Sequence, residues 1–282
     1  MSDQFLGAWL VSEYVYNANG RFAGIIKQRR ELRRLANGRI QVLQQCEPAA
    51  ELAGHPMSRF AGEWVFELSI DGRYRRYHGP AVVGTGVPWG EGAMTGSGLW
   101  PNFGHNFRSF SVMPTAERQL TGGTFLNATE MVANIAGVAM PEEAGADWPQ
   151  LNRYYYPQAT VWQGSLRTVL ANGTVVEERP FTRTFETVSA TALAWQEDGV
   201  ETKMKLENGR FLASSGEMQG IGKLYGPLLE TEMVGENGRS VTNLELLDTI
   251  QGHLIGLRHW KKDGVLEKVE VLRLKKRLER CN

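Results

Sequence analysis

The stretch that decides the fold reads DGRY at residues 71–74, GTGVPW at residues 84–89 and GSGLW at residues 96–100. An acid–glycine turn is followed by two Gly-x-Gly pairs, and each pair leads to a tryptophan. Glycines at this spacing permit sharp bends and close approach of neighbouring backbones, as at barrel corners and strand bulges. The stretch is therefore typical of a strongly curved antiparallel sheet.

A shorter copy of this pattern returns in the second half of the chain. It reads NGRF at residues 208–211 and GIG at residues 220–222, and it ends at Tyr225. Recurrence of one pattern indicates duplicated units. The first copy carries an insertion between Gly86 and Gly98, so Tyr225 corresponds either to Trp89 or to Trp100.

The same glycine pairs could suggest nucleotide binding, but their context argues against it. A dinucleotide fingerprint needs a third glycine that opens a helix, and Val87-Pro88-Trp89 opens none. A phosphate-binding loop would also need Gly-Lys followed by Ser or Thr, which the sequence lacks. We therefore interpret these glycines as structural.

The rest of the chain alternates short apolar runs with turn signals every 8–15 residues or so, which favours a barrel or sandwich. Residues 22–35 have a spacing that also suits a helix, and comparison with the second half favours a strand. We expect a loop at residues 47–58 and a polar linker or long loop at 137–153. The predicted units are residues 1–140, which hold the glycine-rich insertion, and residues 154–282.

Composition limits the class of protein. The chain has 282 residues, 32 of them glycine, and 31 basic residues balance 31 acidic ones. Such a balance gives no support for binding nucleic acid or an anionic membrane. The start lacks a signal-peptide pattern and no apolar run reaches membrane-spanning length, so we expect a cytoplasmic protein. Cys46 and Cys281 have no metal-ligand spacing, so no metal site is predicted.

The segment Phe5-Leu6-Gly7-Ala8-Trp9-Leu10 resembles the Gly-x-Trp signature on the first strand of lipocalins and the wider calycin group. The resemblance implies a lipocalin-like antiparallel β-barrel, and the chain length together with the internal repeat predicts two such barrels in tandem, an all-β fold. It also implies that Trp9 closes one barrel end against a basic residue of the last strand, a role open to Arg273. Double barrels of this kind also occur in some hydratases and cyclases.

An aromatic set could line a pocket for a small, largely apolar or aromatic ligand, or could simply fill the core. Its predicted ligand-binding members are Trp89, Trp100, Phe103, Phe107, Tyr154 and Tyr225. The first unit holds most of them, so we expect binding there, with isomerase, cyclase or hydratase chemistry as an extension. The alternatives are a non-catalytic carrier and a structural or interaction module without a small-molecule site.

His105 is the predicted catalytic residue. If the strand begins early enough, it shares a face with Phe103 and Phe107, because side chains alternate along a strand. Burial there would hold its imidazole neutral, ready to accept a proton. No cofactor is predicted, and haem ligation by His105 is kept as an alternative. The basic run at residues 27–39 could bind an acidic partner, but such residues on alternating strands more often form a solvated outer face, which we expect here.

Overall fold

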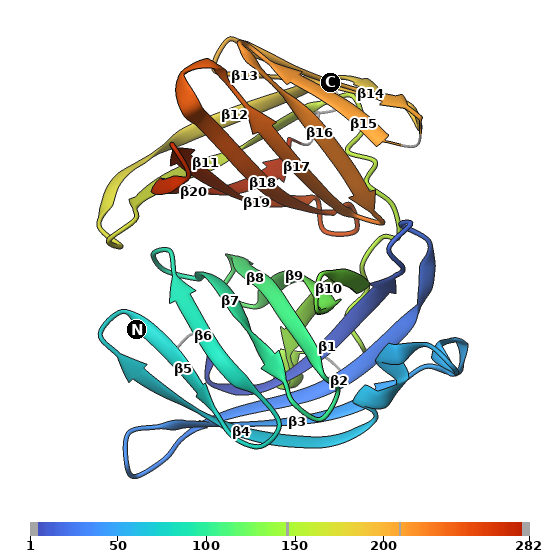
Figure 1. The fold of residues 1–282 in the computed structure, drawn as a ribbon, viewed down its shortest axis with the longest axis vertical. Helices are drawn as coiled ribbons and strands as arrows, with labels where there is room; N and C mark the ends of the chain where they lie inside the picture. Colours follow the sequence, from blue (N-terminus) through green and yellow to red (C-terminus); the bar gives the residue numbers. More distant parts are fainter. Residues whose placement is uncertain (1–4, 145–146, 209, 278–282) are drawn as a thin grey trace. The chain divides into compact units, whose positions relative to one another are not determined.

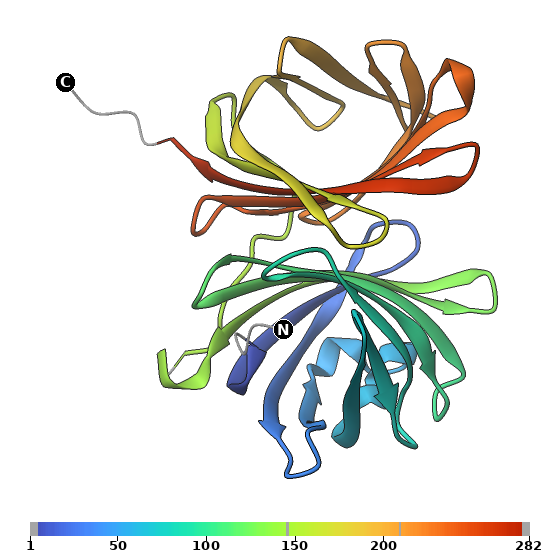
Figure 2. The ribbon, with the colours of Figure 1, turned by 90° about the vertical axis from the view of Figure 1, so that its left-hand side faces the viewer.

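The computed structural model describes residues 5–144, 147–208 and 210–277, and this part of the chain is almost entirely antiparallel β-structure. Twenty strands form two closed barrels of ten strands each (Figures 1 and 2). The chain divides into two compact units, Met1–Arg153 and Tyr154–Asn282, with one barrel in each. The predicted all-β fold with two tandem barrels is confirmed.

The first barrel, called barrel 1 below, connects neighbours in sequence by hairpins, and β1 closes the ring by pairing with both β2 and β10. Its strands are β1 (Gly7–Tyr16), β2 (Phe22–Arg34), β3 (Ile40–Pro48), β4 (Gly62–Asp71), β5 (Tyr74–His78), β6 (Val83–Pro88), β7 (Ala93–Trp100), β8 (His105–Thr115), β9 (Arg118–Asn127) and β10 (Glu130–Pro141). Short 3-10 turns lie between β3 and β4, at η2 (Ala50–Leu52) and η3 (Pro56–Phe60), and after β10 at η4 (Glu142–Ala144).

Barrel 2 repeats this topology, and β11 closes it against β12 and β20. Its strands are β11 (Val161–Leu170), β12 (Val175–Val188), β13 (Ala192–Glu197), β14 (Val200–Glu207), β15 (Arg210–Ser215), β16 (Met218–Tyr225), β17 (Leu228–Val234), β18 (Arg239–Asp248), β19 (His253–Lys262) and β20 (Val265–Lys276). One 3-10 turn, η5 (Glu236–Gly238), precedes β18. Ten strands exceed the eight of lipocalins, so the resemblance holds at the level of a closed antiparallel barrel.

The glycine-rich stretch forms β6 and β7, and its glycines face each other across the two strands. Gly84 pairs with Gly98, and a Cβ added to Gly84 would lie 2.3 Å from the carbonyl oxygen of Ser97. Such a distance is far inside van der Waals contact, so only glycine permits this approach of the two backbones. The structural interpretation of these glycines is confirmed.

The strand registers also decide which aromatic residue corresponds to Tyr225. Gly86 on the sixth strand of barrel 1 pairs with Arg75, the second residue of the fifth strand. Gly222 on the sixth strand of barrel 2 pairs with Phe211, which is also the second residue of its fifth strand. Trp89 and Tyr225 each follow their glycine by three residues. Tyr225 is therefore the counterpart of Trp89 and not of Trp100.

The described structure corrects two expectations about connections. The predicted linker at 137–153 begins too early, because β10 continues to Pro141 in order to pair with Trp9 and close barrel 1. Glu142 then anchors the next turn by pairing with Arg29 at 2.8 Å. Arg273 lies on β20, where it pairs in register with Ser165, so barrel 1 is not closed by the strand that carries it.

Candidate functional site

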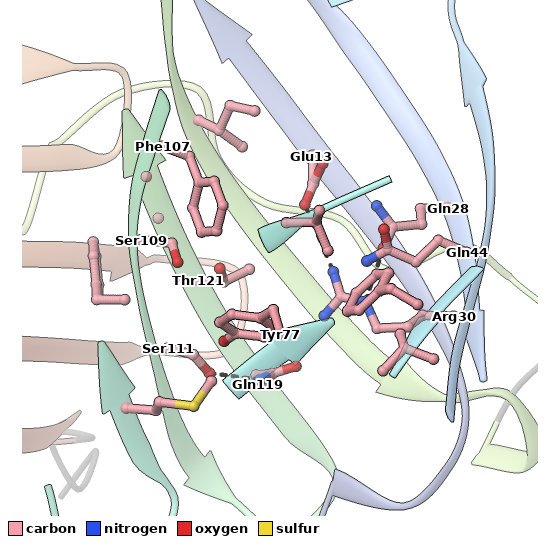
Figure 3. Close-up of a pocket in the computed structure, with 18 of the residues that line it drawn as sticks. Glu13, Gln28, Arg30, Gln44, Tyr77, Phe107, Ser109, Ser111, Gln119 and Thr121 are labelled. Atoms are coloured by element: carbon pink, nitrogen blue, oxygen red, sulfur yellow. Dashed lines mark hydrogen bonds and ion pairs between the residues drawn. The ribbon is translucent and has the colours of Figure 1, made fainter. Parts of the chain in front are cut away.

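Barrel 1 encloses a cavity of about 190 Å³. Apolar side chains from η3 and from strands around the barrel form one part of its wall, and polar side chains of β1, β2, β3, β8 and β9 form another. Figure 3 shows both kinds of side chain, with Phe107 near Ser109 and with Arg30 near Gln44. A mostly apolar hollow with a few placed polar groups is the usual form of a small-molecule site.

The apolar wall is built from aromatic rings in edge and tilted contacts. Phe60 and Trp100 have ring centroids 5.2 Å apart, and Phe107 lies 6.5 Å from Trp100 and 6.4 Å from Tyr77. These separations lie in the range at which aromatic pairs attract one another. The wall is therefore held in place by its own packing and presents ring edges and faces to the cavity.

Arg30 is the central polar group of the cavity. On β2 the alternate residues Gln28, Arg30 and Leu32 all line it, because strand side chains alternate between the two faces. The Nε of Arg30 donates to Oε1 of Gln28 at 2.8 Å, and its Nη2 lies 3.8 Å from Oε1 of Glu13. The expectation that the basic run forms an outer face is therefore wrong for Arg30, which is only 20% exposed.

Glu13 projects from β1 into the same cavity (Figure 3). Burial raises the pKa of its carboxyl above the ordinary value, and the positive charge of Arg30 offsets this only in part. Behind it, burial together with the charge of Glu13 raises the pKa of the Cys46 thiol to about 12. The carboxyl makes no hydrogen bond to any described residue, and Arg30 is the charged group nearest to it.

Tyr77 and a pair of polar side chains complete the lining. A Cβ on Gly86 would lie 2.9 Å from the Tyr77 hydroxyl, and one on Gly96 would lie 3.3 Å from it, so these facing glycines make room for the phenol. Burial raises the pKa of Tyr77, which keeps the phenol neutral. Nε2 of Gln119 donates to Oγ of Ser111 at 2.5 Å.

Barrel 2 holds a network of charged side chains in its interior instead. Arg183 is fully buried and binds both carboxylate oxygens of Glu245 at 2.6 Å, while it also pairs with Glu197. Arg258 binds Glu197 at 2.7 Å, and Tyr155 donates to Glu245 at 3.0 Å. Burial opposes ionisation of Glu245, but Arg183 outweighs it and lowers the pKa of that carboxyl to about 2.

A smaller cavity of about 60 Å³ adjoins this network. Among the described residues, the indole nitrogen of Trp195, the hydroxyl of Thr231 and the amide oxygen of Asn243 line it without a hydrogen-bond partner. Buried polar groups in a hollow of this size are usually satisfied by ordered water. We therefore assign no separate binding role to the smaller cavity.

The structure brings two of the predicted ligand-binding residues, Trp100 and Phe107, to the cavity of barrel 1. Phe103 packs behind it, with its ring centroid 5.9 Å from that of Trp100. Trp89 donates its indole N–H to Thr95 at 2.8 Å and stacks with Arg73, outside the lining.

The remaining predicted residues also lie elsewhere. Tyr154 is 74% exposed, and Tyr225 is buried in barrel 2 with its hydroxyl unpaired among the described residues. His105 begins β8 and is buried, and neither ring nitrogen has a hydrogen-bond partner in the described part of the chain. Burial and the charge of Arg59 lower its pKa. It does not line the cavity, and its catalytic role stays a prediction.

Sequence reasoning missed Glu13, Arg30 and Tyr77. A signal was present for Glu13, because strict alternation from Trp9 through Val11 to Val15 places this acid on an apolar face. For Arg30 the signal was hidden inside a basic run, where the inward position looks like its solvated neighbours. For Tyr77 it required knowing that the glycines of β6 and β7 face each other.

No family model matches this sequence, and no curated protein matches it. The fold is known from other proteins. A crystal structure of a protein of unknown function from the DUF3598 family of Nostoc punctiforme has a TM-score of 0.63 at 13% identity, over 98% of this chain and 97% of that one. An S-type phycobiliprotein lyase of Guillardia theta has a TM-score of 0.35 at 8% identity, over 49% of this chain and 86% of that one. At 13% identity the first match shows likeness of fold alone, and the TM-score of the second is too low to support a conclusion.

The described residues include no cluster of three or more His, Cys, Asp or Glu side chains placed to hold a metal ion. Within the same ranges, no helix has the length and apolar character needed to cross a bilayer.

Proposed function

We propose that barrel 1 binds a small, largely apolar or aromatic molecule. The observation that carries this proposal is the cavity of about 190 Å³ whose wall combines aromatic rings with the polar groups around Arg30. Rings such as Trp100 and Phe107 offer an apolar surface, while Arg30 and Tyr77 offer hydrogen-bond donors that fix orientation. A filled structural barrel would need neither the hollow nor buried donors that face it.

Isothermal titration with 2-naphthamide, a neutral aromatic probe, tests this proposal. We expect one-to-one binding to the whole chain. Ser109→Trp, which fills the cavity from β8, should weaken it at least tenfold, while Arg108→Trp on the outer face of the same strand should leave it unchanged. Absence of binding, or binding that Ser109→Trp leaves intact, would support the alternative of a structural or interaction module without a small-molecule site.

A second function, acid–base chemistry on the bound molecule, is favoured by one observation: Glu13 faces the cavity with a raised pKa and no hydrogen-bond partner among the described residues. Protonated, this carboxyl can donate a proton to a bound molecule; ionised, it can remove one. Such a group serves an isomerase, cyclase or hydratase, whereas a carrier has no use for it.

The aromatic probe 5-nitrobenzisoxazole reports whether Glu13 is a competent base, because removal of the proton on C3 of its isoxazole ring breaks the N–O bond and opens that ring to a cyanophenolate. We expect turnover that rises with pH and disappears in Glu13→Gln. Glu31→Gln, which changes an acid on β2 outside the lining, serves as the control. Equal turnover in wild type and Glu13→Gln would show that Glu13 is not the base, and turnover no faster than in buffer would leave barrel 1 as a non-catalytic carrier.

A further inference from the structure

We propose that the ligand of barrel 1 carries a carboxylate, which binds Arg30 in the place that a glutamate of the protein occupies in barrel 2. This inference rests on the proposed binding function and adds the chemical class of the ligand. It follows from comparing the two barrels position by position, with their strand registers as the guide.

Each barrel has an interior arginine opposite a tryptophan of its first strand. On the first strand of each barrel a tryptophan donates its indole N–H to a carbonyl a few residues earlier, Trp9 to Phe5 and Trp162 to Pro157. Across the next strand Trp9 pairs with Arg30, and Trp162 pairs with Arg183. Arg30 and Arg183 therefore occupy the same position in their barrels.

The two arginines have different partners on the third strand of their barrels. Arg183 pairs in register with Glu197, and Arg30 pairs in register with Gln44. Glu197 supplies a carboxylate to Arg183, whereas Gln44 has the same shape and no charge. Barrel 1 thus lacks the first of the two carboxylates that neutralise this arginine in barrel 2.

The eighth strands of the two barrels, β8 and β18, also carry different side chains at the position that faces the arginine. Trp9 pairs with Pro141 and Trp162 with Lys276 on the last strand of each barrel. Four residues before these partners lie Gly137 in barrel 1 and Leu272 in barrel 2. In barrel 1, Gly137 pairs with Thr121, which pairs in turn with Ser111. In barrel 2, Leu272 pairs with Gly256, which pairs in turn with Glu245. Ser111 therefore stands where barrel 2 has Glu245, the carboxylate that binds Arg183 through both oxygens.

The same registers place Gly123 where barrel 2 has Arg258, because Ser109 pairs with Gly123 and Asn243 pairs with Arg258. Three charged side chains of the barrel 2 network are thus replaced in barrel 1 by an amide, a short hydroxyl and a glycine. Gln44, Ser111 and Gly123 all line the cavity. The cavity of barrel 1 therefore lies beside Arg30, at the positions that the charged network fills in barrel 2.

Arg30 is left without a carboxylate in hydrogen-bonding contact. Its Nε is used by Gln28, and Glu13 stays 3.8 Å from Nη2, too far for a hydrogen bond. Among the described residues no acceptor binds the two terminal nitrogens. These nitrogens are the pair that hold Glu245 when the arginine is Arg183.

The carboxylates around the two matched arginines differ in the same way. In barrel 2, Arg183 and Arg258 are bound directly by Glu197 and Glu245. In barrel 1, Arg30 has the carboxylate of Glu13 at 3.8 Å and no carboxylate bound through both oxygens. A ligand carboxylate would supply that contact, because its planar pair of oxygens fits the guanidinium fork as Glu245 does.

The test compares 2-naphthoate with 2-naphthamide, two probes that differ only in the charge of the group attached to the same ring system. Titration of the whole chain at neutral pH should show naphthoate binding at least tenfold more tightly. Arg30→Met should abolish this preference, so that naphthoate and naphthamide bind the variant with equal affinity. Arg29→Met, the outward neighbour on the same strand, should leave the preference unchanged.

Gln44→Glu provides a second variant that acts without removing Arg30. It restores the carboxylate that barrel 2 has at this position, so the protein should satisfy Arg30 internally. We expect the ratio of naphthoate affinity to naphthamide affinity, both measured on this variant, to fall at least tenfold. A circular dichroism spectrum and a melting temperature like those of the wild type would show that the variant is folded.

Each outcome decides between the proposals. Equal binding of the two probes, or a naphthoate preference that survives both Arg30→Met and Gln44→Glu, overturns the carboxylate assignment and leaves the binding function intact. Binding of neither probe overturns both proposals. A naphthoate preference that both variants remove and Arg29→Met retains supports the assignment.

Discussion

Arg30 stands directly across β2 and β3 from Gln44, at the register where barrel 2 pairs Arg183 with Glu197. One arginine position is thus kept in both barrels, but its partners differ. In barrel 2 they are glutamates that neutralise it within the protein. In barrel 1 the positions of those glutamates carry the uncharged Gln44 and Ser111 beside a cavity, and Glu13 stays 3.8 Å from Arg30.

Removing the main partner of Arg183 should destabilise barrel 2 strongly. Glu245→Gln leaves a buried guanidinium without its bidentate carboxylate, and breaking a buried pair in this way costs roughly 3–5 kcal/mol. Hydrogen exchange followed by mass spectrometry resolves the two units, and we expect faster exchange in β12 and β18 with barrel 1 unchanged. Unaltered protection of β12 would contradict the importance given to this pair.

The same pair predicts a loss of stability in acid. The pKa of Glu245 in the folded protein is lowered to about 2 from an ordinary value of 4.5. Its stabilising contribution is therefore complete above pH 4.5 and is lost as pH falls toward 2. Barrel 2 should lose exchange protection across this window in wild type, and less of it in Glu245→Gln, where the titrating group is absent.

Glu13 predicts the opposite dependence in barrel 1. Because burial raises its folded pKa above the ordinary 4.5, the folded state holds the proton more tightly than the unfolded chain. Stability should therefore fall as pH rises from 4.5 to the folded pKa, with Arg30 and Cys46 as the ionisable groups that face the carboxyl. Glu13→Gln should remove this fall, measured as exchange protection of β1 against pH. A variant with the wild-type pH profile would show that Glu13 is not the group responsible.

Two glycines of one strand should have different consequences when they are replaced. A Cβ on Gly84 meets the backbone oxygen of Ser97 at 2.3 Å, so Gly84→Ala should lower the melting temperature of barrel 1. A Cβ on Gly86 meets side chains and no backbone among its nearest neighbours: the Tyr77 hydroxyl at 2.9 Å and Met94 Sδ at 3.2 Å, both at the ends of side chains that line the cavity. Gly86→Ala should therefore weaken naphthamide binding with a smaller effect on stability, and the reverse pattern would be inconsistent with the close approach of β6 and β7.

The sequence alone predicted the barrels well, because barrel architecture follows from local signals. Turn glycines and period-two alternation are read within a few residues, and the repeat in the second half reinforced them. The cavity was predicted only in part. Trp100 and Phe107 were found as aromatics on a strand, whereas Arg30 and Gln44 acquire meaning only when the register of β2 and β3 is known. Position along a chain does not reveal which positions of two barrels are equivalent.

The catalytic role predicted for His105 is tested by His105→Ala and His105→Gln. Its buried ring lies outside the lining of the cavity, so the geometry favours a packing role. We expect both variants to lower the melting temperature and to keep naphthamide affinity and 5-nitrobenzisoxazole turnover. Loss of turnover in a variant that retains its melting temperature would instead assign the chemistry to His105.

The most direct test of the central claim is a crystal structure of the whole chain with 2-naphthoate. We expect the naphthalene ring against Trp100 and Phe107, with both carboxylate oxygens within hydrogen-bonding distance of the terminal nitrogens of Arg30. This arrangement would reproduce in barrel 1 the contact that Glu245 makes with Arg183. A probe bound outside barrel 1, or one bound inside it with its carboxylate directed away from Arg30, would contradict the claim.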